Sequence, residues 1–240
     1  MNEGERFNLK PGRVIGGKYV VEDFLGAGTE GEVYRVRERR TDLLRAAKIF
    51  YPSRNQRDRA VKFYARKLER LRGCRLVIQY HHSETVRLKR GDATALISEY
   101  VEGELLGRFA AGHRGGRLPV FEALVLLREM AAGLAEIHER REYHGDLHAG
   151  NIIVSRRGVH FNVKLVDLHD HGRSSGWNIR SDVVDLVRVF YDVLGGKKQY
   201  ASMPKEIKTI CCGLRRDLVM ERFPTAVKLR NHLDTFEWGK

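Results

Sequence analysis

Hydrophobic and polar residues alternate along much of the first half of the chain, which is the pattern expected of half-buried β-strands. The strands that this pattern predicts cover residues 19–25, 33–37, 44–51, 76–78 and 95–97. Gly26, Gly28 and Gly31 stand between the first two of these strands. They predict a hairpin whose turn is rich in glycine.

A helical period interrupts the strands once and then dominates the second half. Apolar residues at spacings of three and four predict a helix over 57–72. The helices predicted beyond it cover residues 119–140, 182–194, 205–219 and 225–236. Two short strands, 152–154 and 163–166, are predicted among them. The sequence therefore predicts an α+β chain in which a connector at 98–103 joins a β-rich part to an α-rich part.

Charge is distributed unevenly along this chain. The sequence has 44 Lys and Arg residues against 31 Asp and Glu, a formal net charge of +13. Residues 35–90 contain 18 of the basic residues and 5 of the acidic ones, so this stretch holds the whole excess. Such a face either attracts acidic proteins, phosphorylated ligands, anionic lipid or nucleic acid, or is simply solvated. Nucleic acid is disfavoured, because no aromatic residues are interleaved for base stacking.

Two further features restrict the class of protein. The sequence has no run of 18 apolar residues, so we expect no membrane span, and its first residues lack the apolar core of a signal peptide. Cys74, Cys211 and Cys212 are an odd number of cysteines, which fits a reducing compartment. We therefore expect a cytoplasmic protein, with export by a specialised secretion system left open.

One octapeptide indicates chemistry. Residues 144–151 read His-Gly-Asp-Leu-His-Ala-Gly-Asn and lead into an apolar strand, which places Asp146 and Asn151 on one loop. Phosphoryl transfer from a nucleotide needs a carboxylate that orients the attacking hydroxyl and an amide oxygen that holds a metal ion. The octapeptide therefore predicts a phosphoryl-transfer loop.

The glycine-rich turn fits the same chemistry. Residues 26–33 read G-x-G-x-x-G-x-V, and a strand, rather than the helix of a dinucleotide-binding unit, follows them. A turn between two strands can fold over phosphates and approach them through backbone N–H groups. Lys48 follows in an apolar strand, where a phosphate partner would explain a charge that is costly to bury.

With these motifs in this order, residues 19–236 resemble a protein kinase domain. The resemblance implies a bilobal fold, with a small antiparallel β-sheet N-lobe that contains one helix and a shortened, mainly helical C-lobe. The boundaries it implies are an N-terminal extension at 1–18 and a kinase domain at 19–240, divided into an N-lobe at 19–98, a hinge at 99–103 and a C-lobe at 104–240.

The resemblance also implies ATP and Mg²⁺ as the nucleotide and the metal. The residues it assigns to ATP are Leu25, Gly26, Ala27, Gly28, Gly31, Val33, Ala46, Lys48, Ser98, Glu99, Val101 and Ile153. Asp146 matches the catalytic aspartate, acting with Lys48, and Asn151 and Asp167 match the metal ligands. Asp182 and His144 would support the loop.

The predicted helix at 57–72 departs from the family's pattern. The family carries a helix glutamate that pairs with the strand lysine, and its position falls here on Tyr64. Three arrangements are open: Glu69 pairs with Lys48 from a shifted helix, Lys48 has another partner, or the pair is missing.

The catalytic loop departs from it as well. Gly145 stands where regulated kinases have an arginine that grips a phosphorylated loop. Only 15 positions separate Asp167 from Asp182, with no Ala-Pro-Glu-like end, so regulation by loop phosphorylation has neither receiver nor room. His148 replaces the family's usual basic residue, as in small-molecule phosphotransferases.

We therefore expect an ATP-dependent kinase that phosphorylates serine or threonine in proteins without control by loop phosphorylation. The basic N-lobe, from Arg35 to Arg90, favours an acidic substrate or partner. Two alternatives are a small-molecule phosphotransferase of the same fold, and a pseudokinase that binds a nucleotide or a partner.

Overall fold

The computed structural model describes residues 6–89, 91–169, 171–235 and 237. The chain divides into two compact units. The first consists of Met1–Gly73 and Ile78–Val101, and the second of Cys74–Val77 and Glu102–Lys240. Among the helices of the described residues, none combines the length and the apolar character needed to cross a bilayer.

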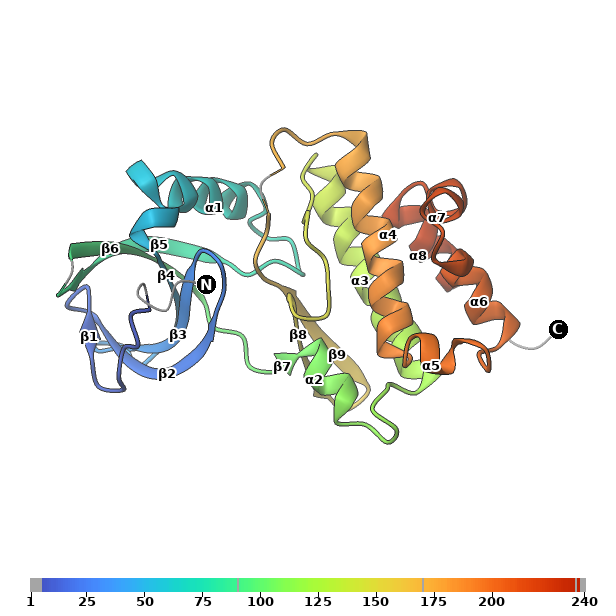
Figure 1. Ribbon diagram of the computed structural model, residues 1–240, viewed down its shortest axis with the longest axis horizontal. Coiled ribbons are helices and arrows are strands. Elements are labelled where there is room, and N and C mark those ends of the chain that lie inside the picture. The colour runs from blue at the N-terminus through green and yellow to red at the C-terminus, as the bar shows by residue number, and fades with distance from the viewer. Residues whose placement is uncertain (1–5, 90, 170, 236, 238–240) are drawn as a thin grey trace. The chain divides into compact units, whose positions relative to one another are not determined.

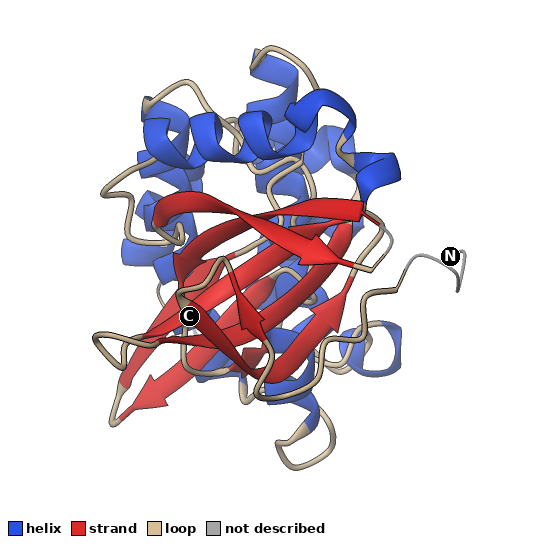
Figure 2. Ribbon diagram, turned by 90° about the vertical axis from the view of Figure 1, so that its left-hand side faces the viewer, coloured by secondary structure: helices blue, strands red, loops and turns tan. Residues whose placement is uncertain are grey.

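A six-stranded antiparallel sheet forms the first unit, with the strand order β1-β2-β3-β4-β6-β5. Figure 2 shows it as a twisted layer of strands. The strands are β1 (Val14–Ile15), β2 (Tyr19–Ala27), β3 (Gly31–Glu38), β4 (Leu44–Phe50), β5 (Tyr80–Leu88) and β6 (Gly91–Glu99). Tyr34, Ala47 and Ile97 are fully buried on one face of this sheet and centre its core.

One helix, α1 (Arg59–Arg70), packs beside β5 and β6 of this unit (Figure 1). Two 3₁₀ turns precede it, η2 (Pro52–Arg54) and η3 (Gln56–Asp58). Val61, Tyr64 and Leu68 are buried, at the spacing of three and four that predicted the helix. The prediction of one helix among the strands is therefore confirmed.

The strand predicted at 76–78 is wrong. Leu76 and Val77 belong to the second unit, where Leu165 N–H donates to Leu76 O at 2.6 Å and Gly133 packs against the Leu76 side chain. The strand that pairs with β6 is β5, whose side chains are mostly polar and partly exposed. An edge strand of this kind has no apolar alternation, so the hydrophobic pattern did not predict it.

The described residues before Tyr19 pack onto the sheet of the first unit. Phe7 and Leu9 lie against the hydrophobic core, and β1 pairs with β2. The buried Glu32 carboxylate accepts hydrogen bonds from the backbone N–H groups of Phe7 and Asn8, each at 3.2 Å. Residues 6–18 are therefore integrated into this unit.

Helices dominate the second unit, in which α3 lies beside α4 and α8 (Figure 1). The helices are α2 (Leu106–Ala111), α3 (Val120–Glu139), α4 (Gly176–Val193), α5 (Lys197–Tyr200), α6 (Lys205–Cys211), α7 (Arg216–Arg222) and α8 (Ala226–Asp234), with the 3₁₀ turn η4 (Cys212–Leu214) after α6. A small antiparallel sheet joins β7 (Glu104–Leu105), β8 (Ile152–Arg157) and β9 (His160–Leu165). An antiparallel sheet with one helix and a mainly helical unit agree with the predicted α+β class.

Two helix predictions in this unit need correction. The single helix expected at 205–219 is broken after α6, because Cys212, Gly213 and Leu214 adopt positive φ angles of 49°, 60° and 60°. Such angles do not continue a right-handed helix. Helix α4 begins at Gly176, earlier than predicted, because Ser175 and Asn178 form a capping box there.

Candidate active site

The residues predicted to act together are divided between the two units. The first unit contains Leu25, Gly26, Ala27, Gly28, Gly31, Val33, Ala46, Lys48, Ser98, Glu99 and Val101. The second contains His144, Asp146, Asn151, Ile153, Asp167 and Asp182. Each unit is therefore described by itself.

Four predicted residues of the first unit share one face of the sheet. Val33 is directly opposite Lys48, and Ala46 is directly opposite Ser98. Directly opposed residues project to the same face, and residues two apart on a strand do so as well. This is the face opposite the core residues Tyr34 and Ala47.

The glycine-rich turn lies between β2 and β3. Gly28 N–H donates to Gly31 O at 2.9 Å and closes the turn. A Cβ atom on Gly31 would lie 2.1 Å from the backbone oxygen of Ile49, so only glycine lets β3 approach β4 this closely. The turn is consequently held at the strand that carries Lys48.

Lys48 pairs with an acid that the sequence analysis missed. Its Nζ atom lies 3.0 Å from Oε2 of Glu30, which belongs to the glycine-rich turn. An acidic residue inside a turn expected to approach phosphates is the signal that could have identified it. The expectation that Glu69 pairs with Lys48 is wrong, because the half-exposed Glu69 side chain pairs with Arg72 at 2.5 Å.

In the second unit, the fully buried Asp182 holds the loop that carries the octapeptide. Its carboxylate accepts hydrogen bonds from the backbone N–H groups of His144 and Gly145, at 2.7 and 2.9 Å. His138 Nε2 lies 3.2 Å from the same carboxylate. A buried carboxylate needs such donors, and they fix the course of the loop.

Asn151 ties the two ends of this loop together. Its amide nitrogen donates to the backbone oxygen of Asp146 at 2.9 Å and to its carboxylate at 3.1 Å. The Asp146 side chain is nevertheless 53% exposed. The structure therefore brings the predicted catalytic acid and the predicted metal ligand side by side.

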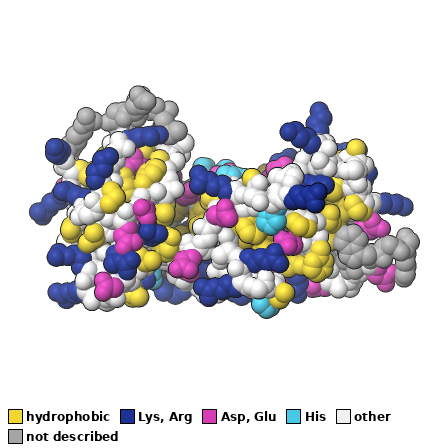
Figure 3. Space-filling model, turned by 90° about the horizontal axis from the view of Figure 1, so that it is seen from below, with side chains coloured by type: hydrophobic (Ala, Val, Ile, Leu, Met, Phe, Trp, Pro, Cys, Tyr) yellow, Lys and Arg dark blue, Asp and Glu magenta, His cyan; other side chains and the backbone are white. Residues whose placement is uncertain are grey.

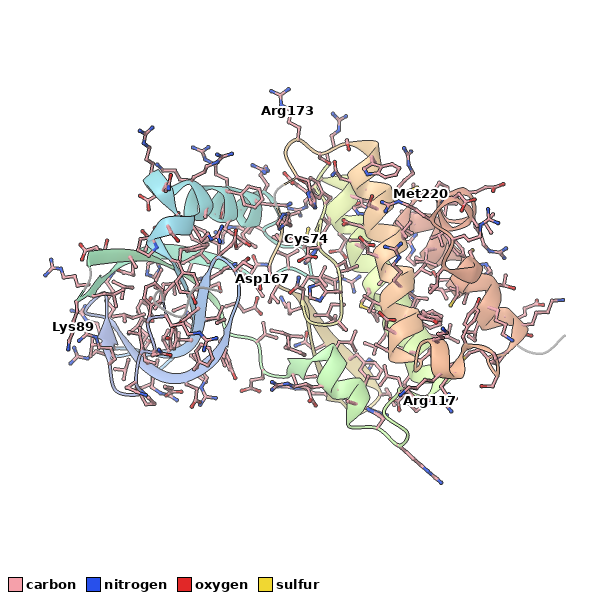
Figure 4. The ribbon with its side chains drawn as sticks, in the orientation of Figure 1. Cys74, Lys89, Arg117, Asp167, Arg173 and Met220 are labelled. Carbon is pink, nitrogen blue, oxygen red and sulfur yellow. The ribbon has the colours of Figure 1, made fainter. Side chains whose placement is uncertain are left out.

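His144 connects the loop to the segment that contains Asp167. Asp146 N–H donates to His144 Nδ1 at 3.3 Å, so the proton of the neutral ring is on Nε2, which donates to Val166 O at 3.0 Å. Asp167, labelled in Figure 4, lies two residues after the end of β9. It has a positive φ of 56°. Asp167 is exposed, and its positive φ turns the chain out of the strand conformation.

His148 lies beside Asp146 in a defined tautomer. Gly150 N–H donates to His148 Nδ1 at 3.0 Å, which leaves the proton on Nε2. That atom lies 3.6 Å from Oδ2 of Asp146. The histidine therefore turns a polarised N–H group toward the predicted catalytic carboxylate.

Gly145 is required by its surroundings. Its φ is +87°, and a Cβ atom there would lie 2.9 Å from Tyr143 Cε2 and 3.0 Å from His171 Cδ2. His171 Nε2 lies 2.8 Å from Gly145 O, and Tyr143 OH donates to Gly172 O at 2.9 Å. The segment after Asp167 is thus bound to the loop without an arginine. Beyond it, the Arg173 side chain points outward (Figure 4).

The donor atoms fit a hard divalent cation. Because the Asn151 amide nitrogen is engaged with Asp146, the side-chain oxygen is the atom that Asn151 can offer. The Asp167 carboxylate and this amide oxygen are both oxygen ligands of the kind that Mg²⁺ prefers. Within the described residues, no group of three His, Cys, Asp or Glu side chains could hold a metal ion. Magnesium at this pair would therefore need phosphate oxygens or water as its other ligands.

Comparison with known proteins gives one consistent family. A model described as the protein kinase domain matches residues 19–202. Serine/threonine-protein kinase pkn2 of Myxococcus xanthus is 29% identical over 158 residues, which cover 64% of this chain and 18% of that protein. Serine/threonine-protein kinase PkaA of Streptomyces coelicolor is 28% identical over 167 residues, covering 65% of this chain and 30% of that protein. The chain therefore spans less than a third of these two relatives.

Solved structures agree at the level of the fold. The Mycobacterium tuberculosis PknI kinase domain, solved as a double mutant, superposes with a TM-score of 0.69 at 20% sequence identity. The match covers 95% of this chain and 98% of that one. A second crystal structure of the same domain gives a TM-score of 0.69 at 19% identity, over 94% and 98% of the two chains. The predicted bilobal fold class is confirmed.

Proposed function

The chain belongs to the protein kinase family, and from this premise we propose that it transfers the γ-phosphoryl group of ATP to a serine or threonine hydroxyl of a protein. The hydrogen-bonded pair of Asp146 and Asn151 is the observation that carries the proposal. The names of the curated relatives, which are serine/threonine-protein kinases, support the choice of acceptor.

Asp146 is the residue to which we assign the acceptor hydroxyl. Its carboxylate is exposed, and Asp182 and Asn151 hold the loop on either side of it. We expect the carboxylate to orient the hydroxyl and accept its proton late, because the transition state of phosphoryl transfer is loose.

Each unit carries its own share of the nucleotide contacts in this proposal. In the first unit, Lys48 and the glycine-rich turn would bind the phosphates, and the backbone of Glu99 and Val101 would bind the adenine edge. In the second unit, the oxygen atoms of Asn151 and Asp167 would hold Mg²⁺. When bound, Mg²⁺ neutralises charge on the phosphate oxygens.

We also propose that activity does not depend on phosphorylation of the segment after Asp167. Tyr143 and Gly145 already bind that segment through His171 and Gly172. Gly145 has no room for the arginine that would receive a phosphate. The segment is therefore held by hydrogen bonds that need no phosphate, so its phosphorylation is not required to order it.

An acidic protein is the substrate or partner that the charge of the first unit favours. Arg59, Lys62 and Arg66 are exposed on α1, within the basic stretch from Arg35 to Arg90. On the face seen in Figure 3, by contrast, Lys and Arg side chains are mixed with acidic and hydrophobic ones. We therefore place the docking of an acidic chain at α1, where a positive surface would speed association.

The test supplies radiolabelled ATP and Mg²⁺ with acidic proteins, basic proteins and a mixture of metabolites. We expect label in protein serine or threonine, and loss of about 10²-fold or more in the Asp146→Asn variant, with ATP binding retained. The matched control is Asp92→Asn, an exposed position of β6. Label in a metabolite alone would favour a small-molecule phosphotransferase. ATP binding without any transfer would favour a pseudokinase.

A further inference from the structure

Two side chains converge on one oxygen atom of Glu30. Lys48 Nζ lies 3.0 Å from Oε2, and Tyr64 OH donates to the same atom at 2.7 Å. All three residues belong to the first unit. The Lys48 side chain is 14% exposed and that of Glu30 is 36% exposed, so the pair is partly shielded from water. Shielding strengthens an ion pair relative to one at the surface.

The backbone fixes Glu30 at this place. Tyr51 N–H donates to Glu30 O at 2.8 Å. The next residue, Gly31, is at a position of β3 where only glycine fits. Gly31 pairs with Phe50 across β3 and β4, two residues beyond Lys48. Because the Glu30 backbone is bonded to the residue that follows β4, and Gly31 pairs with β4 itself, the Glu30 side chain starts close to the strand that carries Lys48.

Tyr64 completes the arrangement from the helix. Its ring lies 4.1 Å from Lys48 Nζ, close enough for a cation–π contact. Burial raises the pKa of Tyr64 well above its ordinary value, so the hydroxyl keeps its proton and remains a donor to Glu30. The helix position where the family has a glutamate thus supplies a hydroxyl group, and the carboxylate comes from the turn.

We propose that Glu30 is the positioning residue for Lys48, supplied by the glycine-rich turn and steadied by Tyr64. The proposal rests on the proposed function, since it assigns the partner of the lysine that would bind the phosphates. It has a structural consequence. Because the carboxylate is part of the turn, the position of Lys48 and the position of the turn over the phosphates are coupled.

The first experiment moves the carboxylate. We expect Glu30→Gln to lower kcat/KM for ATP by roughly 10- to 100-fold, because the lysine loses its charged partner. The double variant Glu30→Gln/Tyr64→Glu places the acid at the family's helix position and should recover about tenfold of the loss. Glu38→Gln, on the same strand as Gly31, is the matched control. Higher activity of Glu30→Gln would show that the carboxylate competes with the phosphates, and would overturn the proposal.

The second experiment does not depend on kinase activity. Lys48 is acylated with an amine-reactive reagent, and its modification rate is measured by peptide mass spectrometry. A neighbouring carboxylate favours the protonated, unreactive ammonium. We therefore expect faster labelling of Lys48 in Glu30→Gln and slower labelling again in the double variant. Equal rates in all three proteins contradict the proposal.

The two experiments separate the two proposals. If the labelling rates change as expected but no variant transfers phosphate to any acceptor, the proposed function fails while the pairing of Glu30 with Lys48 stands. If phosphate transfer occurs but both Glu30→Gln and the double variant equal the Glu38→Gln control, the proposed function stands and the positioning role fails.

Discussion

The side-chain amide of Asn151 donates to the backbone oxygen of Asp146 at 2.9 Å, which closes the loop between them. The same amide nitrogen reaches the Asp146 carboxylate at 3.1 Å. One side chain therefore holds both the backbone and the reactive group of its partner. Because these two hydrogen bonds hold the amide nitrogen, they also fix the direction of the Asn151 side-chain oxygen.

Replacing Asn151 tests how far this tie positions Asp146. We expect Asn151→Ala to lower kcat by about 10²-fold or more, because a displacement of Asp146 by about 1 Å costs this much and the variant also lacks the oxygen proposed to hold Mg²⁺. Steady-state assays with ATP in excess measure it. Asn162→Ala, at an exposed position of β9, is the control and should keep full activity. An Asn151→Ala enzyme with normal kcat would contradict the positioning role.

Gly145 should tolerate no side chain, for two separable reasons. Alanine there would have a positive φ and would meet the rings of Tyr143 and His171. Gly172 has a similar φ of +83° but nothing within 4 Å of an added Cβ. We expect Gly172→Ala to cost about 1 kcal/mol of unfolding free energy and Gly145→Ala about 3 kcal/mol. Urea denaturation measures both, and equal losses would show that steric contact at Gly145 is unimportant.

Phosphatase treatment should leave activity unchanged. The segment after Asp167 is bound by Tyr143 OH, which donates to Gly172 O and accepts from His171 N–H at 2.8 Å. None of these bonds needs a phosphate. Protein purified from a host that phosphorylates it is assayed before and after dephosphorylation, with mass spectrometry to show that phosphate was removed. Loss of most of the activity would contradict the proposal that the kinase does not depend on phosphorylation of this segment.

The segment before Tyr19 should contribute to stability. Removing residues 1–10 takes away the N–H donors of Phe7 and Asn8 from the buried Glu32 carboxylate. We expect a loss of about 3 kcal/mol in the free energy of unfolding, because the buried carboxylate loses two of its donors, keeping those of Tyr34 and Tyr51, and the core loses Phe7 and Leu9. Chemical denaturation measures it. Glu32→Gln in the full chain removes the charge but keeps the segment, and should cost less. Unchanged stability of the shortened chain would show that the segment is dispensable.

The sequence by itself determined the α+β fold class, most helices and strands, and the family. These features follow from local periodicity and from contiguous motifs, as in the alternation of β3 and the octapeptide at 144–151. It also predicts that Tyr64 occupies the position of the family's helix glutamate, and the burial of Tyr64 and Leu68 on one stripe of α1 fits the helix register used for that prediction.

Only the tertiary structure decided which groups meet across distant parts of the chain. Glu30 is 18 positions from Lys48 and 34 from Tyr64, and neither separation has a periodic signature. Glu69 was plausible on a helical register, but its carboxylate is turned to Arg72. The polar edge strand β5 was also decided by its pairing with β6, since it has no apolar pattern of its own. Side-chain partners depend on the close approach of backbones, as at Gly31 and Gly145, which a linear sequence does not encode locally.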